Sequence, residues 1–137
     1  MGGLELEVAT TAVRELSRHG VAELKYIMAE FEPYSSAQRP DVLFWPNSGP
    51  HQGEVFFVEL KMPASATRRL PSPETLEEHR EFLEIDPPDC LRFALATSRR
   101  IDGVTRSAFL AKGFEVLDNI ESGEDLARRI LRWSASP

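Results

Sequence analysis

One segment constrains the fold of this chain more than any other: residues 54–61, with the sequence Glu-Val-Phe-Phe-Val-Glu-Leu-Lys. Its near-continuous apolar run is typical of a β-strand that is buried on both faces, in a sheet covered by helices. The run nevertheless ends with Glu59 and Lys61, which lie two positions apart and therefore project from the same face of the strand. Because a buried charge is costly unless it is paired or binds an ion, this strand end is a candidate site.

The rest of the chain predicts helices and strands that alternate around such a strand. An apolar stripe with helical spacing predicts a helix over residues 4–19, which ends at Gly20. Residues 21–31 suit a helix by composition, but alternating apolar residues favour a strand there. The other predicted strands are 41–45, 54–61, 91–97 and 114–117, and the other predicted helices are 72–84, 105–112 and 122–133. The order α-β-β-β-α-β-α-β-α predicts an α/β fold, a mixed β-sheet flanked by helices.

Composition and charge exclude several classes of protein. The length of 137 residues fits a single domain, residues 1–137, and no apolar run approaches the roughly 18 residues that a membrane helix needs. The only cysteine, Cys90, can form no internal disulfide, and the first residues lack the pattern of a signal peptide. We therefore expect a cytoplasmic protein with no membrane partner. The net charge of −6 argues against a protein that coats nucleic acid through a basic surface.

The hairpin predicted around residues 47–53 brings two carboxylates together. If its strands pair antiparallel around the centre of this turn-rich segment, Asp41 lies opposite Glu59. Directly opposed residues share a face, with Cα atoms roughly 4.5–5.5 Å apart, so the carboxylates converge beside Lys61. This repulsion is understandable if Mg²⁺ binds there, since Mg²⁺ takes one or two carboxylates together with waters and phosphate oxygens. The structural alternative is an ion pair between Glu59 and Lys61 at a fraying strand end.

A sequence motif strengthens the metal-site interpretation. Pro40-Asp41, followed after seventeen intervening residues by Glu59-Leu60-Lys61, resembles the PD-(D/E)XK motif of the restriction endonuclease-like nuclease superfamily. The predicted element order from residue 4 to 118 is also similar to that family, with the motif on the second and third strands. The resemblance implies a restriction endonuclease-like fold and an Mg²⁺- or Mn²⁺-dependent nuclease. The motif is short, so its position on two apolar strands joined by a hairpin is what gives it weight.

The resemblance also implies roles for individual residues. Asp41 and Glu59 would be metal ligands, and the Leu60 carbonyl would be an additional ligand. Lys61 would orient or activate the attacking water and neutralise charge on the phosphate, which agrees with the physical requirements of phosphoryl transfer. Many members of the family add a glutamate from the first helix. Of the candidates Glu5, Glu7 and Glu15, Glu5 lies in the middle of the apolar stripe and is the expected ligand; the alternative is a solvated Glu5 on a frayed helix.

Arginines of the middle third are the expected substrate contacts. Arg80 on the helix 72–84, and Arg68 and Arg69 in the loop before it, are predicted to bind phosphate. His79 is more simply a packing or capping residue. That helix carries none of the Gln or Tyr motifs by which some branches of the family are known, so the resemblance identifies no branch.

The favoured function is a nuclease that acts on DNA in bacterial defence, recombination or repair. Contacts with phosphate drive the affinity for nucleic acid, and this protein is acidic. A homodimer or a DNA-binding partner protein could therefore supply additional phosphate contacts. The alternative function is a catalytically degenerate nuclease fold that serves as a binding or assembly module. The joint presence of Asp41, Glu59 and Lys61 argues against it, since nothing structural requires all three. A third, weaker interpretation is a small α/β domain with a surface ion pair and no catalysis.

Overall fold

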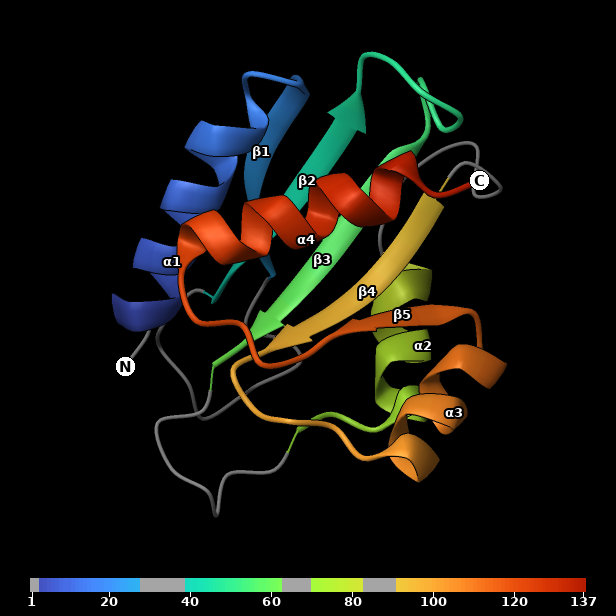
Figure 1. Ribbon diagram of the computed structural model, residues 1–137. Helices are drawn as coiled ribbons and strands as arrows, with labels where there is room; N and C mark the ends of the chain where they lie inside the picture. The colour runs from blue at the N-terminus through green and yellow to red at the C-terminus, as the bar shows by residue number, and fades with distance from the viewer. Residues whose placement is uncertain (1–2, 28–38, 63–69, 83–90) are drawn as a thin grey trace.

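The structure is a computed structural model that describes residues 3–27, 39–62, 70–82 and 91–137 (Figure 1). The helices are α1 (Gly3–Leu16), α2 (Pro73–Phe82), α3 (Gly103–Ala111) and α4 (Gly123–Ala135). The strands are β1 (Gly20–Ile27), β2 (Arg39–Pro46), β3 (Val55–Lys61), β4 (Leu91–Thr97) and β5 (Phe114–Leu117). Their order agrees with the order predicted from the sequence. In this part of the chain, no helix combines the length and the hydropathy needed to cross a membrane.

The strands form one five-stranded mixed sheet in the order β1-β2-β3-β4-β5. Strands β1, β2 and β3 are antiparallel neighbours, whereas β4 lies parallel to β3 and β5 lies parallel to β4. A parallel connection requires a crossover, and here α2 and α3 lie between the parallel strands in sequence. Strand β3 is therefore the central strand, as its apolar run predicts.

Helices cover both faces of the sheet, so the described residues form a three-layered α/β domain (Figure 1). Helices α1 and α4 pack on one face, where Val58 and Leu60 of β3 point. Helices α2 and α3 supply Leu76 and Phe109 to the opposite face, where Phe57 of β3 points. Because side chains alternate along a strand, Glu59 and Lys61 belong to the same face as Phe57.

Several element boundaries differ from the sequence predictions. Helix α1 ends at Leu16 rather than at residue 19, and Gly20 begins β1 instead of ending the helix. Helix α3 starts at Gly103 rather than at 105, because Asp102 is its N-cap and accepts a hydrogen bond from Thr105 N at 2.7 Å. Strand β1 is described as far as Ile27, and the remaining residues of the predicted strand 21–31 lie outside the described ranges. The same applies to the last two residues of the predicted helix 72–84.

Helices α1 and α4 approach each other closely where α4 begins. A Cβ atom added to Gly123 would lie 2.4 Å from the Cβ atom of Thr11 and 2.7 Å from the carbonyl oxygen of Val8. The side chain of Ser122 caps α4 by accepting a hydrogen bond from Asp125 N at 3.0 Å. This contact fixes α1 over the sheet, which matters because α1 carries one of the candidate site residues.

Candidate active site

The register of β2 and β3 brings Asp41 next to Glu59. The paired Cα atoms are Val42 with Val58, Leu43 with Phe57 and Phe44 with Phe56. Extended by one position, this register sets Asp41 opposite Glu59, as the sequence predicts, and the charge of Glu59 acts on Asp41. Both side chains are only 1% exposed. Two carboxylates are thus buried near each other on the face of the sheet covered by α2 and α3.

Asp41 is held by the backbone of the neighbouring strand. Leu60 N donates a hydrogen bond to Oδ1 of Asp41 at 3.0 Å, while Oδ2 is buried and accepts no hydrogen bond from any described residue. Burial raises the pKa of Asp41 well above its ordinary value, and the charge of Glu59 raises it further. The Leu60 hydrogen bond and the Lys61 charge lower this pKa but do not cancel the rise. A nearby cation would therefore stabilise the ionised form of Asp41.

Glu5 reaches this site from α1. Its side chain is 5% exposed, and Oε1 accepts a hydrogen bond from Met62 N at 3.0 Å, just beyond the end of β3. Its charge contributes to raising the pKa of Asp41, after the larger effects of burial and Glu59. Glu5 is thus inward-facing and not solvated, in agreement with its place in the apolar stripe of the helix. Its role as a metal ligand stays a prediction.

Lys61 ends β3 and is partly exposed. Its Cα atom pairs with that of Thr97 at the end of β4, and its charge lowers the pKa of Asp41. The structure therefore brings Glu5, Asp41, Glu59 and Lys61 into one neighbourhood. They come from α1, β2 and β3, and Glu5 lies 36 positions before Asp41 in the sequence.

Strand β1 contributes a residue that the sequence interpretation missed. The register of β1 and β2 pairs Lys25 with Asp41, so the two side chains share a face. Lys25 is half-buried and forms no ion pair with any residue in the described ranges. Residues 24, 26 and 28 share one face of the predicted strand, so Lys25 was expected on the other face. The sequence between β1 and β2 contains no symmetric turn that would fix the register, so the residue opposite Lys25 could not be predicted.

The predicted substrate arginines are not placed by the structure. Arg68 and Arg69 lie outside the described residues, and Arg80 belongs to α2 but its side chain lies outside the description. Their predicted contacts with phosphate therefore stay predictions.

The described residues provide part of a metal-ligand set. In the ranges 3–27, 39–62, 70–82 and 91–137, no three His, Cys, Asp or Glu side chains stand together as a ready-made metal site. Two carboxylates are nevertheless a sufficient protein contribution for Mg²⁺, which usually retains several waters and takes phosphate oxygens from a substrate. The buried, unbonded Oδ2 of Asp41 is a suitable oxygen for such an ion.

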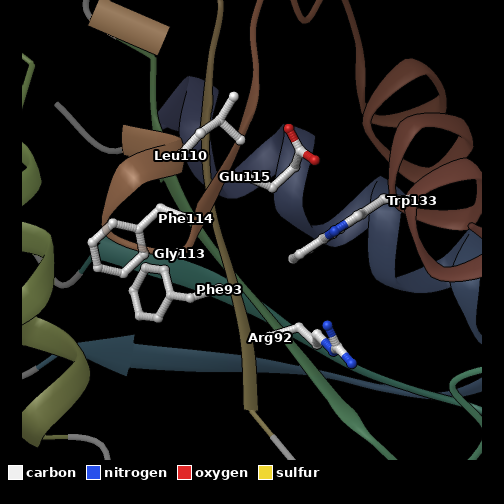
Figure 2. A pocket seen from close by; sticks show the side chains of 7 residues that line it. All are labelled: Arg92, Phe93, Leu110, Gly113, Phe114, Glu115 and Trp133. Carbon is white, nitrogen blue, oxygen red and sulfur yellow. The ribbon is translucent and has the colours of Figure 1, made fainter. Parts of the chain in front are cut away.

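A separate cleft of about 370 Å³ lies at the opposite end of the sheet (Figure 2). Arg92 and Trp133 line it together with the start of β5. Arg92 stands near the start of β4, whereas Glu59 pairs with Leu95 towards the end of that strand. The cleft and the carboxylate site are therefore different regions of the molecule.

Comparison with known proteins identifies a shared fold but no family. No family model matches the sequence, and no curated protein matches it. Among solved structures, the chain is similar to protein VC1899 from Vibrio cholerae, with a TM-score of 0.56 and 14% sequence identity. The match covers 96% of this chain and 33% of that protein, so the chain spans about a third of its length. At this identity the likeness shows the fold alone.

Proposed function

We propose that this chain is a restriction endonuclease-like domain that hydrolyses phosphodiester bonds in DNA with the help of Mg²⁺ or Mn²⁺. One observation carries the proposal: Asp41 and Glu59 are buried next to the paired residues Val42 and Val58, the charges of Glu59 and Lys61 act on Asp41, and Asp41 keeps an unbonded oxygen. In a protein that binds no cation, this arrangement brings no gain in stability, because each negative charge increases the free-energy cost of burying the other.

The donor atoms of the site fit a hard divalent cation. Oxygen ligands are what Mg²⁺ prefers, and the carboxylates of Asp41 and Glu59 with the carbonyl of Leu60 would hold it. Glu5 is a further candidate ligand, because it keeps a second carboxylate oxygen besides the one that accepts the Met62 hydrogen bond. The bound cation would act as a Lewis acid on a phosphoryl oxygen and lower the pKa of a coordinated water.

The chain's own residues would bind and orient the substrate. Lys61 supplies a fixed positive charge where negative charge develops on the phosphate, and it can orient the attacking water. The hydrogen bond from Leu60 N holds the Asp41 carboxylate against β3, and the hydrogen bond from Met62 N holds Glu5 at the end of the same strand. These two backbone contacts keep the acidic groups in place before any substrate binds, which is the preorganisation that catalysis requires.

The direct test is cleavage of plasmid, single-stranded DNA and RNA with Mg²⁺, with Mn²⁺ and with chelator. We expect metal-dependent cleavage of DNA that Lys61→Ala abolishes, while circular dichroism shows an intact fold. Lys112→Ala is the matched control, because Lys112 lies beyond α3 and pairs with Glu77 at 3.6 Å. Cleavage that survives in Lys61→Ala would contradict the assigned role. If none of the three nucleic acids is cleaved with either metal, the degenerate binding module becomes the better interpretation.

A further inference from the structure

Basic residues gather at the end of the sheet where the carboxylates lie. Strand β1 runs parallel to β3, since each is antiparallel to β2, and β4 also runs parallel to β3. The carboxyl ends of these three strands therefore lie on the same side of the molecule. Lys25 is near the end of β1, Lys61 ends β3, and Arg99 and Arg100 follow the last residue of β4.

The loop that carries the two arginines is fixed to its surroundings. Arg99 N donates to Oγ1 of Thr97 at 3.2 Å, and Asn119 N donates to the carbonyl oxygen of Arg99 at 2.9 Å. Ile120 N donates to the carbonyl oxygen of Thr97 at 3.0 Å. Asn119 adopts a left-handed backbone conformation with φ 55°, which asparagine tolerates better than most residues. The backbone of Arg99 is thus held between β4 and the segment that follows β5.

Arg100 differs from other arginines of the same region. Arg106 and Arg129 are engaged by Asp118, at 2.8 and 3.7 Å respectively. Arg100 is exposed and forms no hydrogen bond or ion pair through its side chain within the described residues. Its charge is therefore available to a ligand.

The face that carries Lys25 is accessible along β1. Val21 and Glu23 share this face by alternation, and both are exposed, Val21 by 57%. On the other side of the site, Thr97 pairs with Lys61 and therefore continues the same face onto β4. Thr97 itself is fully buried, so a ligand that lies across the strand ends can approach the half-buried Lys25, the partly exposed Lys61 and the exposed Arg100, with the buried acidic pair beneath its path.

The spacing of the strands suits a nucleic-acid backbone. Neighbouring strands are about 4.8 Å apart, so the three steps from β1 to β4 span about 14 Å. One strand of a duplex advances about 3.4 Å per nucleotide along the helix axis, so a path of about 14 Å is long enough for more than one phosphate group. The two ends of this path are cationic and its middle contains Asp41 and Glu59.

We infer that Lys25, Lys61, Arg99 and Arg100 form a phosphate track that holds one nucleic-acid strand across the carboxyl end of the sheet. The strand runs transverse to β1–β4, so that the phosphate between the outer contacts lies over the acidic pair. Contacts to phosphates alone make this binding independent of base sequence. The inference rests on the proposed function and specifies how its substrate is held.

The test is the salt dependence of binding, measured by fluorescence anisotropy with a labelled single-stranded oligonucleotide in chelator, so that cleavage does not interfere. We expect Lys25→Ala and Arg100→Ala each to reduce the slope of log K against log salt by about 0.7. For salt plots that meet at 1 M, this change of slope corresponds to a dissociation constant about eightfold higher than that of the wild type at 50 mM salt. Arg132→Ala is the matched control, since Arg132 is an exposed arginine of α4 outside the track; it should leave the slope unchanged.

Several outcomes would overturn the inference. It is wrong if Arg100→Ala and Arg132→Ala have equal effects, if Lys25→Ala changes nothing, or if the wild type binds no nucleic acid. The proposed function fails separately. A wild type that binds through the track but never cleaves with Mg²⁺ or Mn²⁺ refutes the nuclease and keeps the track. A wild type that cleaves, with KM unaltered in Lys25→Ala and Arg100→Ala, keeps the nuclease and refutes the track.

Discussion

Replacing Asp41 by asparagine should make the metal-free protein more stable. Asparagine keeps the Oδ1 atom that accepts the hydrogen bond from Leu60 N at 3.0 Å. It removes a negative charge that is 1% exposed and lies beside Glu59 in the register of the sheet. The amide also brings a donor in place of the unbonded Oδ2 atom. The substitution therefore conserves shape and backbone contact and removes chiefly the repulsion.

The size of the effect follows from the geometry of opposed strand residues. Their side chains start about 5 Å apart, and two unit charges at about 5 Å in an effective dielectric of about 20 repel by about 3 kcal/mol. The Lys61 charge offsets part of this repulsion, which leaves about 1–2 kcal/mol of unfolding free energy to be gained. In a protein of 137 residues this corresponds to a rise in Tm of about 3–8 °C.

The gain should depend on pH in a defined direction. Burial, and then the charge of Glu59, raise the pKa of Asp41 above its value in the unfolded chain. A carboxyl group with a raised pKa contributes stability that is fully present below its unfolded pKa and is lost as the pH rises through its folded pKa. The unfolding free energy of the wild type should therefore drop below that of Asp41→Asn as the pH rises, and the two values should converge at acidic pH.

Thermal melts in chelator from pH 5 to pH 9 measure this difference. Glu23→Gln is a suitable control, because Glu23 is an exposed carboxylate on the neighbouring strand β1 and its loss changes the net charge equally. Added Mn²⁺ should raise the Tm of the wild type more than that of Asp41→Asn, since a ligand that binds only the folded state stabilises it. A lower Tm for Asp41→Asn at every pH, with no response to Mn²⁺, would refute the reasoning and make Asp41 a structural ion-pair partner.

The β2–β3 hairpin was predictable because local sequence determines its register. The turn-rich segment 47–53 has a clear centre, and apolar residues on both sides restrict which face each strand can bury. A register shift of one residue would have exchanged the faces of the sheet on which Phe57 and Val58 lie. The opposition of Asp41 and Glu59 follows from this constraint. The inward position of Glu5 was predictable for a similar reason, since the stripe that contains it must face the sheet.

Lys25 could not be placed in the same way. The segment between β1 and β2 gives no symmetric turn from which to count, and the register that pairs Lys25 with Asp41 becomes known only from the assembled sheet. The arginine loop is a comparable case. Arg99 lies near the site because Asn119 and Ile120, about twenty residues later, donate hydrogen bonds to the end of β4. Contacts of such long sequence separation are set by tertiary packing, which no local pattern encodes.

Two substitutions test the packing that supports the site. Gly123→Ala should destabilise the protein by about 1–3 kcal/mol, because the new Cβ atom would lie 2.4 Å from Cβ of Thr11; Gly103→Ala, which meets nothing within 4 Å, should be neutral in the same melts. Asp118→Asn should cost about 1–3 kcal/mol at neutral pH, since Asp118 is 8% exposed, pairs with Arg106 at 2.8 Å and accepts a hydrogen bond from Ile101 N at 2.9 Å. Burial alone would raise the pKa of Asp118, but these contacts outweigh it and lower the pKa below its ordinary value. A group with a lowered pKa contributes stability above its unfolded pKa and loses it as the pH falls through its folded pKa. The difference between wild type and Asp118→Asn in urea unfolding should therefore be constant from neutral pH down to mildly acidic pH and shrink in strong acid; a difference that grows on acidification would show that Asp118 is not the ionised partner of Arg106.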